Sequence, residues 1–330
     1  MQTVRMLGGE RVEVVNAPDP EPTEGGVVVR VRASGLCGSE MHRYRDAQTI
    51  EAPPNGGHEP AGEVVDATRS HRWQVGDRVG IHAAWGCGRC DWCAQGIYTF
   101  CDHHSAGVGA HAELFAAPDH VLVRLPDDAD YPVGALLAGD GLGVPYHTSQ
   151  RLKTRGGDTV AVVGCGPIGL GNVLVQAFLG ARVVGLDLVP RRLDWARELG
   201  AAATLDPGEE PVEALRAITA GRMADAVIEA SGRPEGFALA LRLVGKGGTI
   251  ACCGENRDVA LHVGRDLIRR DITLFGGWFY HYRDYPRMLE LRRRGLPVER
   301  LISHRFGLEQ AGEAFAQFAA GQTAKVVLTP

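Results

Sequence analysis

The feature that most constrains the fold is a glycine-rich turn that fits the pattern G-x-G-x-x-G. Its residues are Gly164, Cys165, Gly166, Pro167, Ile168 and Gly169. An apolar segment expected to be a strand, residues 159–163, precedes the turn, and an amphipathic segment expected to be a helix, residues 168–179, follows it. The first glycine permits the sharp bend, the second lets the backbone approach a pyrophosphate, and the third allows close helix packing. The pattern predicts a dinucleotide-binding βαβ unit; a glycine-rich turn without a ligand is the alternative.

The residue that ends the next expected strand, Asp187, predicts which dinucleotide binds. A carboxylate at this place accepts hydrogen bonds from the adenosine ribose of NAD and repels the 2′-phosphate of NADP. Arg191 and Arg192 are the counter-observation, because arginine can accommodate that phosphate. We therefore expect NAD as the cofactor, held by the glycine-rich turn and Asp187.

The order of the expected elements divides the chain into two parts. The first part has short apolar segments between glycine and proline residues, expected to be strands at 27–33, 62–67, 78–82 and 111–117. From about residue 158 strands and helices alternate, with further strands expected at 182–187, 225–228, 249–253 and 272–275. This alternation predicts a doubly wound parallel sheet. A chain of 330 residues suits two domains of about 150 residues each.

Charge and hydropathy exclude several classes of partner. With 35 basic and 40 acidic residues and a formal net charge of −5, the chain has no electrostatic basis for binding nucleic acid or an anionic membrane. The one basic run, 292–294, is interpreted as a solvated helix face. The longest uncharged run, 159–181, contains the glycine-rich turn and two amides, which argues against a membrane span. No signal peptide is recognisable, so we expect a cytoplasmic protein with reduced thiols.

Half of the eight cysteines form a cluster with the spacing C-x2-C-x2-C-x7-C: Cys87, Cys90, Cys93 and Cys101. Thiolates at this spacing can close a tetrahedral zinc site in which the protein occupies every position. An iron–sulfur cluster is the alternative, but the usual ferredoxin run has a shorter last spacing and a following proline. The pattern favours a structural zinc ion, which holds a loop together and takes no part in chemistry.

A second combination, Cys37 and His58, matches two of the three protein ligands of a catalytic zinc site. Such a site keeps its fourth position for water or substrate. Cys37 follows an expected strand within the sequence GLCGSEMH, and His58 lies in GGHE. From the residues alone, a buried cysteine and an unrelated histidine explain the pair equally well.

In this order, the motifs resemble those of the zinc-dependent alcohol dehydrogenases of the medium-chain dehydrogenase/reductase family, of the polyol or sugar type. The resemblance covers nearly the whole chain and rests on GLCGSEMH, GGHEPAG, GDRV, the four cysteines, GCGPIG with Asp187, and the closing AKVVLTP. It implies an α/β chain with a GroES-like β-rich catalytic domain at 1–147 and 300–330, which includes a structural zinc lobe at 86–102, and a Rossmann domain at 148–299. It also implies an active site between the domains and assembly as a homodimer or homotetramer.

The resemblance assigns roles to the residues near the catalytic zinc. Cys37 and His58 match the first two ligands, and Asp140 matches the third, at a place where many members have cysteine. Carboxylate is an acceptable zinc ligand, and a helix cap is the alternative role for Asp140. Glu59 matches an acid that can approach the metal during ligand exchange, so either Asp140 or Glu59 could complete the site. Glu40 matches an acid that orients the zinc-bound histidine.

The resemblance also implies the course of the reaction. Zinc polarises a substrate hydroxyl, and a hydride passes to NAD and leaves a ketone or aldehyde. Ser39 and His42 match the family's proton relay, which runs from hydroxyl through nicotinamide ribose to imidazole. Arg192 matches a cation near the adenosine ribose, a role compatible with NAD. One structural and one catalytic site predict two zinc ions per chain.

The residues expected to line the substrate side are polar, which favours a hydroxyl-rich small molecule such as a polyol, a sugar, a sugar acid, an amino-sugar or a cyclitol. They are Arg43, Tyr44, His82, Trp85, His111, Trp278, Tyr280 and His281. The alternatives are dehydrogenation of a simpler primary or secondary alcohol, a zinc-free reductase of the same superfamily, and a non-enzymatic binding protein. Retention of the zinc ligands and of the glycine motif argues against the last two.

Overall fold

The second half of the chain folds around one parallel sheet in the structure, a computed structural model that describes residues 1–48 and 54–330. Its strands follow the spatial order β12-β11-β10-β13-β14-β15. Their bounds are β10 (Thr159–Val163), β11 (Arg182–Leu186), β12 (Ala203–Leu205), β13 (Ala224–Glu229), β14 (Val244–Cys252) and β15 (Thr273–Gly276). The order reverses between β10 and β13, as it does in dinucleotide-binding sheets. The doubly wound parallel sheet expected from the sequence is confirmed.

The helices of this sheet begin in a way that the sequence explains. They are α5 (Pro167–Phe178), α6 (Pro190–Glu198), α7 (Pro211–Ile218), α8 (Pro234–Leu243) and the short α9 (Val263–Asp266). The first four start at proline, whose fixed backbone angle suits the first helical position and whose missing N–H is not needed there. β10 is buried along its whole length, because helices cover both faces of such a sheet. Among the described residues, no helix is long and apolar enough to cross a membrane.

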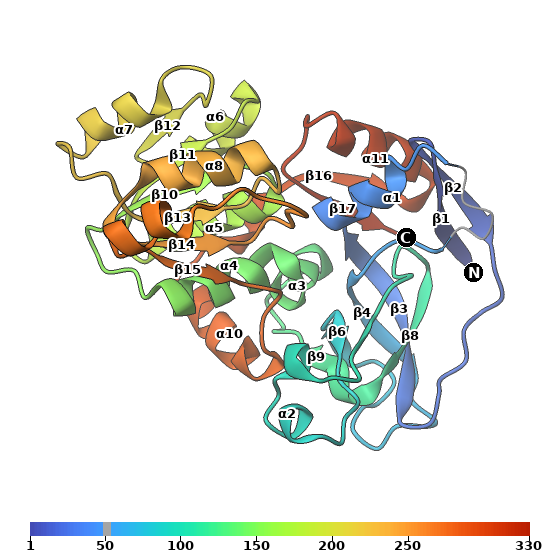
Figure 1. Ribbon diagram of the computed structural model, residues 1–330. Helices are drawn as coiled ribbons and strands as arrows, with labels where there is room; N and C mark the ends of the chain where they lie inside the picture. The colour runs from blue at the N-terminus through green and yellow to red at the C-terminus, as the bar shows by residue number, and fades with distance from the viewer. Residues whose placement is uncertain (49–53) are drawn as a thin grey trace. The chain divides into compact units, whose positions relative to one another are not determined.

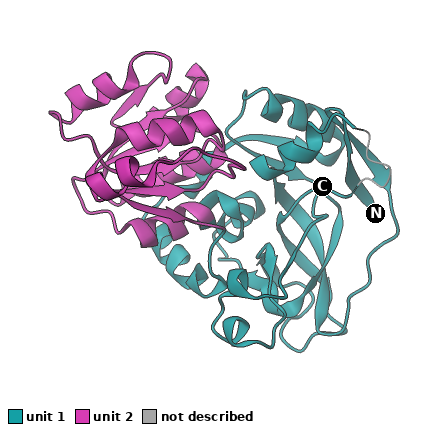
Figure 2. Cartoon of the chain, viewed as in Figure 1, with its two compact units in different colours: residues 1–143, 279–330 teal, residues 144–278 magenta. Residues whose placement is uncertain are grey.

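The chain divides into a first unit, Met1–Gly143 with Phe279–Pro330, and a second unit, Val144–Trp278 (Figure 2). The first unit contains a sheet of order β16-β17-β3-β4-β5-β9, with β8 paired to β3 (Figure 1). Its strands are β3 (Gly26–Gly35), β4 (Glu59–Asp66), β5 (Arg78–Ile81), β8 (Leu114–Pro118), β9 (Leu122–Arg124), β16 (Ile302–Gly307) and β17 (Lys325–Thr329). Two small antiparallel pairs flank it: β1 (Gln2–Gly8) with β2 (Arg11–Asn16), and β6 (Ala84–Trp85) with β7 (Ser105–Ala106).

The helices of the first unit are short and are separated by long stretches of chain. They are α1 (Met41–Tyr44), α2 (Asp91–Ala94), α3 (Tyr131–Ala138), α10 (Tyr285–Arg293) and α11 (Ala311–Ala319). A further helix, α4 (Asp140–Leu152), begins in the first unit and continues into the second. α11 packs with β17 and β1 around a core that includes Phe315, Leu328 and Met6. The C-terminal segment thus belongs to the first unit.

The boundaries of the units differ from those expected, because residues 279–299 belong to the first unit and not to the second. Three tyrosines of this segment, Tyr280, Tyr282 and Tyr285, anchor it. Their hydroxyls donate to the carbonyl oxygens of Ala138, Leu122 and Arg124 at 2.8, 2.7 and 3.0 Å. Such contacts join distant parts of the sequence, so the strand and helix pattern along the chain gives no sign of them.

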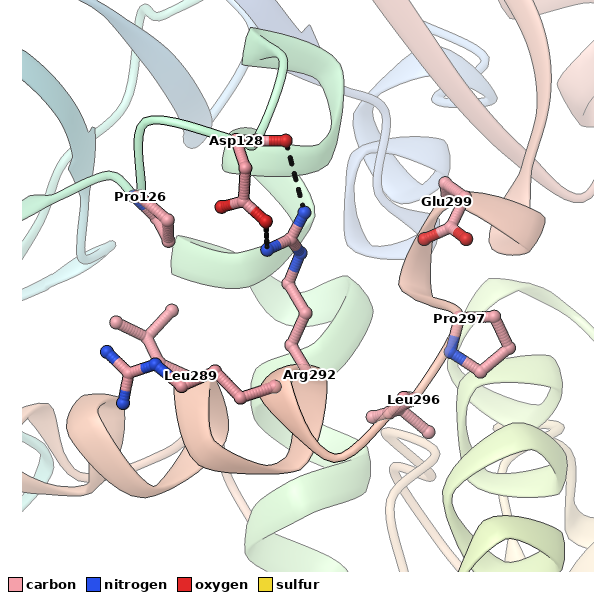
Figure 3. Close-up of a pocket in the computed structure, with 9 residues that line it drawn as sticks. Pro126, Asp128, Leu289, Arg292, Leu296, Pro297 and Glu299 are labelled. Carbon is pink, nitrogen blue, oxygen red and sulfur yellow. Dashed lines mark hydrogen bonds and ion pairs between the residues drawn. The ribbon is translucent and has the colours of Figure 1, made fainter.

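The basic run 292–294, expected to be a solvated helix face, is solvated only in part, because Arg292 is paired with an acid. The Arg292 Nη1 atom lies 2.6 Å from Asp128 Oδ2, and the Arg292 side chain is only 19% exposed (Figure 3). Both residues line a pocket of about 420 Å³ together with Leu289 and Leu296. Arg292 therefore fastens α10 to the segment before α3, while Arg293 and Arg294 are exposed.

Candidate active site

Three segments of the first unit bring together four potential metal ligands, Cys37, His58, Glu59 and Asp140, which we call the mixed cluster. Cys37 lies just after β3, His58 immediately precedes β4, and Asp140 is the first residue of α4. β3 and β4 are antiparallel neighbours whose register sets Gly35 opposite Glu59. The four ligand atoms all lie within 4.8 Å of one another. The sheet thus gathers residues that are far apart in the sequence.

Asp140 contacts both of the other expected ligands. Its Oδ2 atom is 3.1 Å from Cys37 Sγ and 3.2 Å from His58 Nε2. Ligand atoms at usual zinc distances in a tetrahedron are about 3.3–3.5 Å apart, so the spacing fits zinc. The side chains of His58 and Asp140 are 16% and 13% exposed, which leaves access for a further ligand. The orientation of the carboxylate favours the ligand role of Asp140 over a helix cap.

The protonation of these groups is strongly linked. Burial raises the pKa of the Cys37 thiol, and the nearby charge of Asp140 adds to this effect. Burial lowers the pKa of His58, but the charge of Cys37 and the hydrogen bond to Asp140 outweigh it, so this pKa lies well above its ordinary value. Burial raises the pKa of Asp140, but its hydrogen bond to His58 and the charge of His58 leave it below its ordinary value. Metal binding here therefore displaces protons from Cys37 and His58.

Glu59 is held beside the mixed cluster by a buried lysine that the sequence analysis missed. Lys325, the first residue of β17, forms an ion pair with Glu59 Oε1 and donates to the Leu36 carbonyl oxygen at 2.8 Å. Glu59 is fully buried and Lys325 is 2% exposed. The second carboxylate oxygen, Glu59 Oε2, has no hydrogen-bond partner among the described residues. Glu59 is thus neutralised on one side and has one oxygen free on the other.

Glu40 makes no hydrogen bond to the His58 ring, which the resemblance implied that it orients; its hydrogen bonds go to other groups. The carboxylate accepts hydrogen bonds from the backbone N–H of Cys37 at 3.0 Å and of Gly57 at 2.8 Å. It also lies 3.2 Å from His111 Nε2. Burial raises the pKa of Glu40, but the charge of His111 outweighs it and lowers the pKa to about 2. Glu40 thus joins the backbones of the two loops that carry Cys37 and His58.

The residues expected to form a proton relay lie beside Cys37. Ser39 belongs to the one-turn helix Gly38–Glu40, His42 belongs to α1, and both side chains are exposed. Exposure suits a group that passes a proton to solvent. Their part in proton transfer stays a prediction.

Half of the side chains expected to line the substrate side are buried against protein groups. Tyr44, His82, His111 and Tyr280 are at most 4% exposed. The ring nitrogens of His82 lie 2.9 Å from the carbonyl oxygens of Ala84 and Tyr280, and burial lowers the pKa of His82 to about 4. His281 lies 3.1 Å from Thr99 Oγ1 and also packs against Phe100. Polar composition alone could not separate these structural side chains from those that meet substrate.

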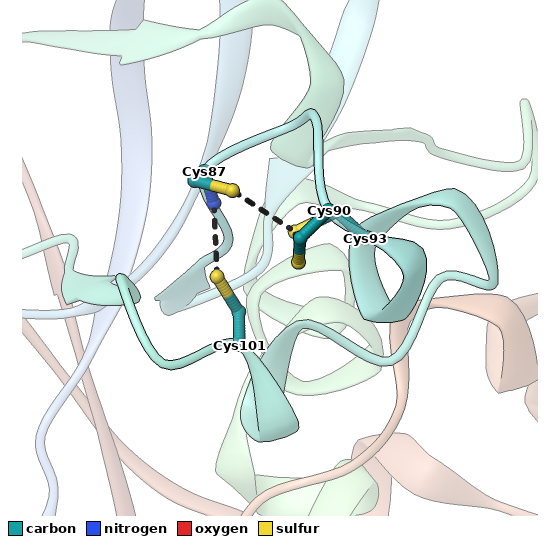
Figure 4. A group of neighbouring side chains, drawn as sticks. All are labelled: Cys87, Cys90, Cys93 and Cys101. Atoms are coloured by element: carbon teal, nitrogen blue, oxygen red, sulfur yellow. Dashed lines mark hydrogen bonds between the residues drawn. The ribbon is translucent and has the colours of Figure 1, made fainter.

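The four cysteines Cys87, Cys90, Cys93 and Cys101, which we call the four-cysteine cluster, converge around α2 (Figure 4). The Sγ atom of Cys93 is 3.5 Å from that of Cys90 and 4.0 Å from that of Cys87. Sulfur atoms around a tetrahedral zinc ion are about 3.8 Å apart, so the spacing fits zinc. A hydrogen bond from the Arg89 backbone N–H lowers the pKa of Cys87 to about 6, whereas burial raises that of Cys93 to about 12. All eight cysteines of the chain are free of disulfides.

The glycine-rich turn has the conformation that its sequence predicts. Gly164 has a φ of +90°, and a Cβ there would lie 2.7 Å from the Ser231 backbone. A Cβ at Gly169 would lie 1.8 Å from the Gly164 carbonyl oxygen. At Gly166, however, no heavy atom of the described residues other than its own chain neighbours lies within 4 Å of the Cβ position. Protein packing therefore requires the first and third glycines, and the space beside Gly166 fits a pyrophosphate at the start of α5.

Asp187 lies directly after β11 and closes the glycine-rich turn. Its Oδ2 atom accepts a hydrogen bond from the Cys165 N–H at 2.7 Å, and its Oδ1 atom accepts one from the Val189 N–H at 2.9 Å. Arg192 Nη1 lies 3.6 Å from Asp187 Oδ2. Because a carboxylate has further lone pairs, Asp187 can still accept hydrogen bonds from a ribose.

Family models and relatives agree with this description. The "Zinc-binding dehydrogenase" model matches residues 167–293 and the "Alcohol dehydrogenase GroES-like domain" model matches residues 23–127. An uncharacterized zinc-type alcohol dehydrogenase-like protein of Escherichia coli, YphC, is 32% identical over 99% of this chain and 98% of its own. L-threonine 3-dehydrogenase of Symbiobacterium thermophilum is 34% identical over 100% and 98%, and sorbitol dehydrogenase of Bacillus subtilis is 29% identical over 95% and 92%.

Solved structures extend the likeness to the fold. Alcohol dehydrogenase TADH from Thermus sp. ATN1 matches with a TM-score of 0.91 and 30% identity, with full coverage of both chains. Galactitol-1-phosphate dehydrogenase from Escherichia coli matches with a TM-score of 0.88 and 25% identity over 100% of both chains. The chain therefore belongs to the zinc-dependent alcohol dehydrogenases of the medium-chain dehydrogenase/reductase family.

Proposed function

We propose that this protein is a zinc- and NAD-dependent oxidoreductase that interconverts a secondary alcohol on a hydroxyl-rich small molecule and its ketone. The observation that carries the proposal is the mixed cluster, in which a thiol, an imidazole and two carboxylates offer ligand atoms that all lie within 4.8 Å of one another. A set of three protein ligands with access for a fourth is typical of catalytic zinc sites. A zinc-free reductase does not need these three ligands, so their presence argues against that alternative.

Cys37, His58 and Asp140 are assigned as the ligands of the catalytic zinc. Asp140 is preferred to Glu59 as the third ligand because Asp140 Oδ2 contacts both Cys37 and His58, while Glu59 is paired with Lys325. Glu59 Oε2, which has no hydrogen-bond partner among the described residues, would be available to approach the metal. Zinc bound there supplies Lewis-acid polarisation of a substrate hydroxyl, and NAD supplies the hydride acceptor. Cys87, Cys90, Cys93 and Cys101 are assigned to the structural zinc.

Proton release is assigned to Ser39 and His42. An alcohol whose carbinol carbon gives up a hydride must also lose its hydroxyl proton, and that proton has to reach water. Ser39 follows the ligand Cys37 closely in the chain, and His42 is an exposed imidazole on the adjoining helix. Imidazole is the side chain that most often passes protons in enzymes that work near neutral pH.

The cofactor preference follows from the second unit. Gly164, Gly166 and Gly169 with the start of α5, at Pro167 and Ile168, are assigned to the pyrophosphate. Asp187 is assigned to the adenosine ribose, with Arg192 beside it. A carboxylate at this position favours NAD over NADP because it repels the additional phosphate. The free cysteines fit a reducing compartment such as the cytoplasm, and a homodimer or homotetramer is the expected assembly.

The substrate class is now supported mainly by relatives, because several polar side chains first assigned to the substrate are buried. The names of three relatives specify L-threonine, sorbitol and galactitol 1-phosphate, molecules in which a hydroxyl neighbours other polar groups. The Thermus protein TADH is named only as an alcohol dehydrogenase, so a simpler alcohol remains the second candidate for the substrate. An assay that compares both classes on one preparation distinguishes them.

The test combines metal analysis with a substrate panel. Protein prepared without chelator should contain about two zinc equivalents, one for each cluster. Reduction of NAD should be fastest with a member of a panel of polyols, sugar acids, cyclitols and hydroxy amino acids, and slow with ethanol and propan-2-ol. A preference for the simple alcohols would reassign the substrate class, whereas activity that survives loss of the second zinc equivalent would refute the zinc mechanism.

A further inference from the structure

A buried carboxylate joins the two loops that carry Cys37 and His58. Glu40 Oε2 accepts from the Cys37 N–H, and Glu40 Oε1 accepts from the N–H of Gly57, the residue just before His58. Glu40 is only 7% exposed, so water does not compete for these hydrogen bonds. One side chain thereby fixes the backbone on both sides of the mixed cluster.

Glu40 is itself held by a histidine and a serine that lie farther from the metal position. His111 Nε2 lies 3.2 and 3.4 Å from the two oxygens of Glu40, and Ser34 Oγ lies 2.8 Å from His111 Nδ1. Both His111 and Ser34 are fully buried. With Nε2 facing the Glu40 carboxylate and Nδ1 facing the Ser34 hydroxyl, each of these groups has a hydrogen-bond partner. The three side chains form one continuous hydrogen-bonded chain.

The backbone around His111 also fits tightly against the loop before His58. A Cβ at Gly57, where φ is +94°, would lie 2.4 Å from the His111 nitrogen and 2.7 Å from its ring. A Cβ at Gly56 would lie 3.1 Å from the His111 ring and 3.2 Å from Glu40 Oε1. The His111 N–H donates to the Gly56 carbonyl oxygen at 2.8 Å. Gly57 is therefore required by its contact with His111, and a side chain at Gly56 would need His111 and Glu40 to shift slightly.

We propose that His111 and Ser34 are positioning residues of the catalytic metal site, which set the spacing of Cys37 and His58 through Glu40. Neither side chain touches the metal position; each acts by restricting the next group along the hydrogen-bonded chain. The inference rests on the proposed function, because it requires Cys37 and His58 to hold zinc. Outer partners of metal ligands typically change metal affinity by about 10- to 100-fold when they are removed. The chain should therefore govern how long zinc stays in the mixed cluster.

The experiment measures the release of zinc from purified holoenzyme to a colorimetric chelator. His111→Phe keeps a ring of similar size but removes both hydrogen bonds, and Ser34→Ala removes only the support of His111. We expect His111→Phe to speed the release of one of the two zinc ions by about 10- to 100-fold, and Ser34→Ala to speed it less. The double variant should release zinc no faster than His111→Phe, because Ser34 acts only through His111. Release of the other zinc, in the four-cysteine cluster, should not change.

A matched histidine controls for loss of a partly buried imidazole elsewhere in the same unit. His304 on β16 is half-buried, and its Nδ1 atom contacts Ser303. His304→Phe should leave the release of both zinc ions unchanged. A thermal melt of each variant measures general loss of stability alongside the metal assay.

Unchanged zinc release in both His111→Phe and Ser34→Ala would overturn the inference. Faster release of both zinc ions, in step with a lower melting temperature, would also overturn it, because it would indicate only a structural role. If His111→Phe does not fold, Ser34→Ala, which loses a single hydroxyl, decides the question alone. A wild-type protein that holds only the structural zinc would contradict the proposed function itself, a result visible before any variant is made.

Discussion

The four-cysteine cluster and the mixed cluster differ in how the chain assembles them. The four cysteines all lie within residues 87–101, around the one-turn helix α2, so a single loop can gather them. The mixed cluster takes Cys37 from the end of β3, His58 from the start of β4 and Asp140 from the start of α4. It exists only once the sheet has formed in the correct register. A loop can stabilise itself around a metal, whereas a catalytic site needs its ligands fixed by the fold.

The groups that surround the two clusters also differ, because one cluster is assisted by the nearby backbone and the other by side chains from distant segments. Backbone N–H groups assist the four-cysteine cluster, as at Cys87. Buried charged side chains surround the mixed cluster: Glu40 lies on one side, and the Glu59–Lys325 pair lies on the other. Buried charges are costly unless they are paired and hydrogen-bonded, and here each is. The comparison predicts that damage to the mixed cluster removes activity, while damage to the four-cysteine cluster removes stability.

The largest effect is expected for Asp140→Ala. The substitution removes the atom that contacts both Cys37 and His58, so turnover should fall by more than the roughly 100-fold that loss of an outer partner costs. One of the two zinc equivalents should also be lost or held weakly. Binding of NAD, measured by titration, should persist, because the glycine-rich turn is untouched.

Asp140→Asn is the matched control, because it keeps the shape of the side chain and loses its charge. It should retain at most a small fraction of the activity, since an amide is a poorer zinc ligand than a carboxylate. If Asp140→Ala instead keeps near wild-type kcat and a full zinc complement, Asp140 is only the first residue of a helix. Glu59, through its free oxygen, would then complete the site.

Cys90→Ser should have the opposite effect. A structural zinc ion contributes folding free energy directly, so loss of one thiolate should lower the free energy of unfolding by several kcal/mol. At temperatures where the variant is still folded, kcat should stay close to that of the wild type. Thermal melting and metal analysis of the same samples test both statements. A variant that melts normally but loses activity would reverse the comparison between the clusters.

The sequence predicts best those parts of the fold and of the candidate site whose residues lie close together in the chain. The glycine-rich turn, the strand before it and the helix after it form one continuous segment, and β10 was predicted with its observed bounds. The four cysteines converge as their spacing indicated. In each case the decisive interactions lie within a few turns of chain.

Contacts between distant segments could not be predicted in the same way. Lys325 pairs with Glu59 because β17 lies beside β3 in the sheet, and nothing in the sequence near either residue indicates this. His111 was expected near substrate because it is polar, yet it is buried against Glu40 and Ser34. The sequence AKVV offered the one signal for Lys325: a lysine at the start of an apolar strand needs a partner when it is buried.

The partners of Asp187 are farther along the chain than those within the four-cysteine cluster but still lie within one βαβ unit. Asp187→Ser should have the smallest of the effects predicted here. The substitution removes the negative charge beside Arg192 and the proposed acceptor for the ribose, so the enzyme should use NADP better relative to NAD. A hydrogen bond to a charged group is worth about 1.5 kcal/mol or more, which is roughly tenfold in the ratio of kcat/KM for the two cofactors. Asp194→Ser, which removes an exposed acid of the same helix region that pairs with Arg197, should leave the ratio unchanged. A wild-type enzyme that already prefers NADP would contradict the assignment of Asp187. Arg191 and Arg192 would then be the residues that select the cofactor.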